Sequence, residues 1–139
     1  MEELNFYYNH ILFIPAVAFV VSVFIKGISS IIKSWKLDLS VALWSWGMPS
    51  AHTAVTVWLT TALALKYGVT SDLFALALSF TVIIIYDAIN IRYEAWLHAW
   101  ALNKHIWERK FRESLGHLPS EAFAWSIVWI ITAVVMFYI

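Results

Sequence analysis

The sequence contains no cysteine and few charged residues. The absence of cysteine excludes disulfide bonds, thiolate metal sites and cysteine nucleophiles from this 139-residue chain. Only 13% of the residues are charged and the net charge is zero, so no nucleic-acid partner is expected. What remains is strongly apolar, with 62% hydrophobic residues and a mean hydropathy of +0.75. This composition lies outside the range of soluble domains and predicts an integral membrane protein.

Apolar segments predict a bundle of about four transmembrane helices. A helix needs about 20 residues to cross a bilayer, so the chain has room for about four spans and short connections. The apolar runs that supply them are 5–25, 53–65, 73–86 and 122–139. No repeat, low-complexity tract or linker interrupts the chain, which predicts a single all-α transmembrane domain over residues 1–139. Because its start is acidic where a secretory signal is basic, we expect the first run to be retained.

Turn-forming residues separate the second and third runs. The segment YGVTSD contains Gly68, which is typical of the position that follows a helix. Thr70 or Ser71 is a typical N-cap for the next helix. The sequence therefore predicts a tight link between these two spans.

The third apolar run is too short to cross a bilayer alone. We expect its helix to continue through Asp87 and Arg92, which places ionisable groups at or just inside the membrane face. Small and polar residues then recur at helical spacing and form one stripe: Ala88, Arg92, Ala95, Ala99 and Asn103. Tyrosine and tryptophan residues lie beside the stripe, as is typical of a membrane surface. The segment therefore predicts an amphipathic helix that runs along the interface.

Basic residues are concentrated on one side of the predicted bundle. With four spans, one side receives both the 26–47 and the 92–117 connections. This side carries eight of the nine basic residues: Lys26, Lys33, Lys36, Arg92, Lys104, Arg109, Lys110 and Arg112. By the positive-inside rule it is cytoplasmic, so we expect a plasma-membrane protein with both termini outside. The simpler interpretation is that these cations only set the topology.

Two helix starts on the same side have similar sequences. GMPSAH (47–52) and GHLPSE (116–121) both place Pro-Ser after a glycine, with a histidine nearby. Proline suits a first helical turn, and the free N–H groups of a helix start attract anions. The same side also receives the ionisable residues Lys26, His52, Asp87, Arg92, His117 and Glu121. This convergence predicts a phosphate-binding site, although each motif alone could be an ordinary helix start with a capping serine.

The spacing of His117 and Glu121 indicates chemistry beyond binding. Residues four apart share a helical face, so the carboxylate could orient the imidazole and make it a better nucleophile or base. An alternative is that these two residues, with His52 and Asp87, hold zinc or manganese. No HExxH or paired-carboxylate motif supports that alternative. A purely structural histidine is the third possibility.

Three segments carry a family resemblance. They are GMPSAHTA (47–54), DAINIRYEAWLHAWALN (87–103) and ESLGHLPSEAF (113–123). In order and position they resemble the signature blocks of the divergent type-2 phosphatidic acid phosphatase family, small membrane proteins related to acid phosphatase and vanadium-dependent haloperoxidase. The resemblance covers nearly the whole chain, from about Lys26 to the C-terminus.

The resemblance implies hydrolysis of a phosphomonoester or diphosphate on a lipid head group. It implies a phospho-histidine mechanism that needs neither metal nor cofactor. Carried over to this chain, His117 is the nucleophile, Glu121 orients it and His52 is the general acid. The residues implied for the phosphate site are Lys26, Ser50, Asp87, Arg92 and Arg112.

The chain departs from the family pattern at several positions. The wider superfamily has Asp at the position of Glu121, and its arginine stands one residue further from the nucleophile than Arg112. Tryptophan occupies three positions where glycine is usual, Trp46, Trp96 and Trp125. A second function class therefore stays open, namely a catalytically silent membrane protein that binds or moves anionic lipid, with tryptophan closing the gap between the histidines. The sequence does not distinguish the lipid or the oligomeric state.

Overall fold

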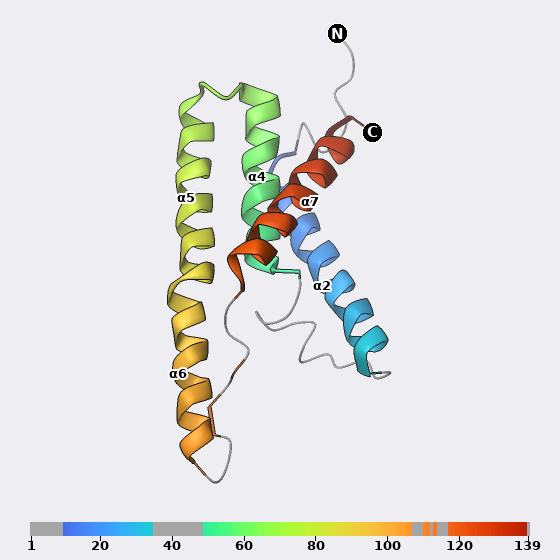
Figure 1. Ribbon diagram of the computed structural model, residues 1–139. Coiled ribbons are helices and arrows are strands. Elements are labelled where there is room, and N and C mark those ends of the chain that lie inside the picture. The colour runs from blue at the N-terminus through green and yellow to red at the C-terminus, as the bar shows by residue number, and fades with distance from the viewer. Residues whose placement is uncertain (1–9, 35–48, 107–109, 112, 114–116, 139) are drawn as a thin grey trace.

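The computed structural model describes residues 10–34, 49–106, 110–111, 113 and 117–138. Within these residues the chain forms helices and no strand, which confirms the predicted all-α class (Figure 1). The helices are α2 (Phe13–Ser34), α4 (Ala51–Tyr67), α5 (Asp72–Ile89), α6 (Ile91–His105) and α7 (Pro119–Tyr138).

Helix α4 lies at the centre of the bundle. It packs against α2, α5 and α7, and it contains more buried residues than any of these neighbours. α2 and α5 run in the opposite direction to α4 and α7, whereas α6 continues beyond α5 (Figure 1). The starts of α4 and α7 and the junction of α5 with α6 consequently lie at about the same level.

Small side chains and hydroxyl groups join α4 to its neighbours. Ala18 and Ala54 are fully buried, and small residues allow helix backbones to approach closely inside a membrane. The hydroxyl groups of Thr60 and Thr81 lie 2.8 Å apart, and Thr81 also donates to the Thr56 carbonyl at 3.2 Å. These bonds satisfy polar groups between α4 and α5 without water.

The outer surface of the bundle is apolar. Phe24 is 67% exposed and Ile83 is 63% exposed, an arrangement that suits contact with lipid. Among the described residues, three segments are long and apolar enough to cross a membrane, Phe13–Ile32, Asp72–His105 and Pro119–Tyr138. α4 has 17 residues, at the lower end of the length that spans a bilayer, and its neighbours cover much of it. The predicted helical membrane bundle is confirmed.

The boundaries of the first span differ from the expectation. The uncharged run stops before Lys26, but α2 begins at Phe13 and continues for two turns beyond Lys26 to Ser34. A lysine next to an apolar run usually places its charge at the membrane surface, but the Lys26 side chain is turned into the bundle, where it is 2% exposed. The apolar run 5–25 therefore did not give the end of this helix.

The third span continues past Asp87 and Arg92 as predicted, with a break at Asn90. Asn90 ends α5 and starts α6, with φ −114° and ψ −76°. Its side-chain amide donates to the Tyr86 carbonyl at 3.1 Å, a local bond that competes with the helical ladder. α6 continues from this break and projects beyond the starts of α4 and α7 (Figure 1).

The link between α4 and α5 has the predicted caps. Gly68 adopts φ 85° and its N–H donates to the Ala64 carbonyl at 2.9 Å. Of the two N-cap alternatives the structure has Ser71, whose hydroxyl accepts from Phe74 N–H at 3.2 Å. No atom lies within 4 Å of a Cβ built on Gly68, so only the backbone angle there requires glycine.

We expect Gly68→Ala to lower the free energy of unfolding by about 1 kcal/mol, because alanine disfavours a positive φ. Gly68→Asn should lower it by a similar amount, since ψ is 157° at Gly68 and the left-handed region that asparagine tolerates lies at a ψ of about 45°. Reversible denaturation in mixed detergent micelles measures both. Equal stability of the alanine variant and the wild type would contradict this account of the link.

Candidate functional site

The three motif-bearing segments meet where α5 joins α6. The His117 backbone N–H donates to the Ala88 carbonyl at 3.3 Å, which attaches the segment before α7 to the end of α5. Asp87 and Arg92 flank this point on α5 and α6. The start of α4, which carries His52, lies at the same level (Figure 1).

His117 is buried at the centre of a charged environment. It is 9% exposed, and the charges of Lys26, Arg92, His52 and Glu121 all act on it. Burial lowers the pKa of His117 most; Lys26, Arg92 and His52 lower it further, and Glu121 alone raises it. The net result is a pKa below the usual histidine range, so the imidazole is neutral near pH 7. A neutral ring has the free lone pair that a nucleophile or base requires.

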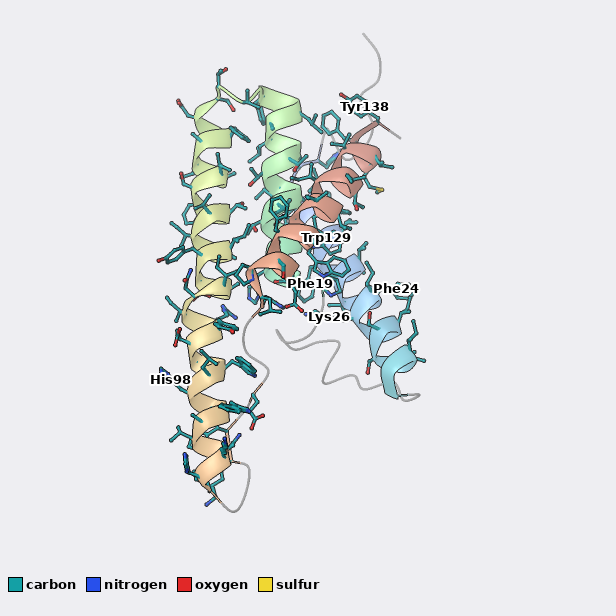
Figure 2. All side chains as sticks on the ribbon, in the orientation of Figure 1. Phe19, Phe24, Lys26, His98, Trp129 and Tyr138 are labelled. Carbon is teal, nitrogen blue, oxygen red and sulfur yellow. The ribbon has the colours of Figure 1, made fainter. Side chains whose placement is uncertain are left out.

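Lys26 reaches the same region from the middle of α2. Its side chain is among the largest that are fully buried, and Figure 2 labels it near the middle of α2. The charge of Lys26 acts on both His52 and His117. A positive charge in the interior of a membrane bundle is expensive, which makes Lys26 a candidate for function.

Arg92 and Asp87 form an ion pair across the break at Asn90. The Arg92 Nε atom lies 2.5 Å from Asp87 Oδ2, with both side chains about one-third exposed. The sequence placed both residues in the phosphate site. In the structure Asp87 holds the guanidinium, whose remaining N–H donors can face an anion. The charges of both residues also act on His52.

Glu121 does not share a helical face with His117. α7 begins at Pro119, so His117 precedes the helix and the rule for residues four apart does not apply. Glu121 Oε2 accepts a hydrogen bond from the Leu118 N–H at 2.9 Å, as in one half of a capping box. Glu121 therefore acts on the His117 imidazole through its charge.

The start of α4 combines a cap with a histidine. Ser50 is the N-cap, and its hydroxyl accepts from Thr53 N–H at 3.4 Å. This is the ordinary capping role that the sequence left open, and it leaves the hydroxyl proton available to an acceptor. His52 follows in the first turn with an exposed side chain. Arg112 lies outside the described residues.

A cavity of about 230 Å³ lies beside His117. Its described lining residues are Tyr93, Trp96, Glu113, His117, Leu118 and Glu121. Trp96, one of the three departures from the family pattern, lines this space and leaves it open. Trp125 packs instead on Trp129, with ring centroids 5.9 Å apart, and Trp46 lies outside the described residues.

The ligand set of the metal alternative does not assemble in the described part of the chain. No three histidine, aspartate or glutamate side chains there are close enough to hold one ion. Of the four residues in that alternative, Asp87 pairs with Arg92 and Glu121 caps α7.

Comparison with known proteins gives the same assignment as the motifs. The family model described as the divergent PAP2 family matches residues 7–132. The chain belongs to the divergent PAP2 family. It is 33% identical to the uncharacterized membrane protein YuiD of Bacillus subtilis, over 77% of this chain and 80% of the relative. No solved structure matches it.

Asn103 holds the connection that precedes His117 in this family member. Its amide nitrogen donates to the Phe111 carbonyl and to Glu113 Oε1, both at 2.7 Å. Its oxygen accepts from the N–H groups of Lys110 and Phe111, at 3.1 and 3.0 Å. The sequence placed Asn103 in the small-and-polar stripe without assigning it a site role. A buried polar residue at the end of that stripe was the available signal.

We expect Asn103→Ala to destabilise the protein by about 2–3 kcal/mol and to expose the α6–α7 connection, because four hydrogen bonds lose their partner. Amide hydrogen exchange of the connection and denaturation in micelles test this. Asn90→Ala is the matched control: its exposed amide makes one local bond, so the change should stay within about 0.5 kcal/mol. Similar effects of the two substitutions would remove the special role of Asn103.

Proposed function

We propose that this protein is a membrane-embedded phosphatase that hydrolyses a phosphomonoester or diphosphate on a lipid head group. The observation that carries the proposal is the buried His117 imidazole beside an open cavity, with the charges of Lys26 and Arg92 acting on it. Membership of the divergent PAP2 family supports the reaction class. The apolar exterior supports a lipid substrate, since such a molecule reaches the site from the bilayer.

In the proposed first step, a nitrogen of His117 attacks phosphorus. The N–P bond forms as the bond from phosphorus to the head-group oxygen breaks, and His52 donates a proton to that oxygen. In the second step water attacks phosphorus, the N–P bond breaks and inorganic phosphate leaves. The proton lost by water returns to His52, so the enzyme is regenerated and no metal or cofactor takes part.

Electrostatic stabilisation would supply much of the rate. Charge on the transferring phosphoryl group spreads over its outer oxygens, and preorganised donors stabilise it most. Lys26 and Arg92 are the proposed clamps, with Asp87 orienting Arg92. Ser50 and the free N–H groups at the start of α4 complete the proposed cradle.

One feature favours the non-catalytic alternative, in which the same groups bind anionic lipid without hydrolysis. The carboxylate of Glu121 is bonded to the Leu118 backbone, and its contact with the imidazole is through charge alone. Binding of a phosphorylated lipid by the wild type without phosphate release would support this alternative.

We expect His117→Gln to reduce phosphate release from lipid phosphates about 1,000-fold or more, because the nucleophile is lost. His52→Gln should reduce it about 100-fold or more. His98→Gln is the control, since His98 is exposed on α6 and points away from the bundle (Figure 2). The assay measures release from phosphatidate, phosphatidylglycerophosphate and a polyprenyl diphosphate. Undiminished release by His117→Gln would refute the mechanism.

We further propose that the protein lies in the plasma membrane with its site facing the cytoplasm and both termini outside. Lys104 and Lys110, near the C-terminal end of α6, support this orientation, because the positive-inside rule places lysine-rich ends in the cytoplasm. The link between α4 and α5 lies at the opposite end of the bundle (Figure 1).

Because the chain has no cysteine, single cysteines can report the orientation without background. Thr70→Cys lies in the link between α4 and α5, and His105→Cys ends α6; both positions are exposed. In intact cells a membrane-impermeant maleimide should label Thr70→Cys and leave His105→Cys unlabelled, while lysed cells should show both. The reverse pattern in intact cells would invert the proposed topology.

A further inference from the structure

The cavity beside His117 differs in chemistry from the phosphate clamps. Two aromatic rings and two carboxylates line it, together with the imidazole and Leu118. None of its described lining residues is a lysine or an arginine. A phosphate group in this space would therefore be repelled by the two carboxylates.

The aromatic part of the lining comes from one face of α6. The rings of Tyr93 and Trp96 have centroids 5.4 Å apart and planes inclined by 35°. The faces of such rings carry negative charge density and attract cations, most strongly where water is excluded. A pair of neighbouring rings suits an organic ammonium group better than a small hydrated ion.

Both carboxylates are fixed at the cavity by hydrogen bonds through one oxygen. Glu113 Oε1 accepts from the Asn103 amide at 2.7 Å, and Glu121 Oε2 accepts from Leu118 N–H at 2.9 Å. In each case the second oxygen has capacity to pair with a cation. A fixed carboxylate next to an aromatic pair favours binding of a positive group, because neither partner must be ordered on binding.

His117 also points to a ligand in this space. It is nine-tenths buried and lines the cavity, and its imidazole makes no hydrogen bond within the described residues. Lys26 and Arg92 act on the same ring but do not line the cavity. His117 therefore stands between a cationic group of residues and an anionic one.

We propose that the cavity is a subsite for a cationic part of the substrate. The substrate class is an amphiphile that carries an ammonium group within a few bonds of its phosphoryl group. The phosphoryl group faces Lys26 and Arg92 while the ammonium group contacts Tyr93, Trp96, Glu113 and Glu121. This assignment rests on the proposed function for the position of the phosphoryl group, but ammonium binding can be measured without turnover.

Two phosphomonoesters of the same shape test the subsite. One is phosphocholine, and the other is its neutral isostere, in which a tert-butyl group replaces the trimethylammonium group. We expect the purified protein in a non-ionic detergent to bind phosphocholine about tenfold more tightly, as measured by isothermal titration. Phosphate release, followed in the same samples, reports the proposed function separately.

Substitutions of cavity residues test whether the preference for phosphocholine arises in this cavity. Trp96→Leu and Glu113→Gln should each bring the affinity ratio towards one, and glutamine can still accept the bond from Asn103. Two controls should keep the ratio of the wild type. The first is Trp100→Leu, because Trp100 lies outside this cavity with the Lys104 ammonium 5.2 Å from its ring. The second is Glu94→Gln, because Glu94 is exposed.

Equal binding of the two esters by the wild type would overturn the subsite even if lipid phosphates are hydrolysed. A tenfold preference that survives in both Trp96→Leu and Glu113→Gln would also overturn it. A preference that both variants abolish, without phosphate release from any lipid, would retain the subsite and reject the phosphatase. Competition by magnesium chloride equal to that by tetramethylammonium chloride would assign the cavity to an inorganic cation and reject the ammonium proposal.

Discussion

The site depends on how the chain returns from the end of α6 to the start of α7. Asn103 binds the backbone at Phe111, and the Ala88 carbonyl binds His117. These two bonds attach Phe111 to α6 and His117 to the end of α5, so they help to position the His117 imidazole. Asn103 also holds Glu113, which lines the cavity.

The electrostatic environment of this position then determines which protonation state of the His117 imidazole is favoured. Lys26 is buried in α2 and Arg92 is held by Asp87, so two positive charges act on a ring that has little contact with water. Burial and these charges all disfavour the imidazolium form. A buried lysine that acts on a buried histidine favours an anion over a cation at that point, which is why we propose a phosphoryl site there. On the cavity side of His117 the local charge is negative instead, because the carboxylates of Glu113 and Glu121 lie there.

Much of the fold could be predicted because hydropathy and turn chemistry act locally. The apolar runs indicated the spans, Gly68 and Ser71 gave the link, and the small-and-polar stripe gave the buried face of Ala88, Ala99 and Asn103. Local patterns did not give the end of α2, since the burial of Lys26 depends on neighbouring helices. They also misplaced Glu121 relative to His117, because Pro119 starts α7 one residue after Leu118. The motifs identified which residues to consider, and tertiary packing determines their positions and contacts.

The central claim is that His117 itself becomes phosphorylated during turnover. Rapid quenching under alkaline conditions, with a substrate labelled in its terminal phosphate, followed by peptide mass analysis, tests this most directly. The account predicts label on the peptide that contains His117 in the wild type and no label in His117→Gln. Hydrolysis that proceeds with label on another residue, or that persists in His117→Gln, would contradict it.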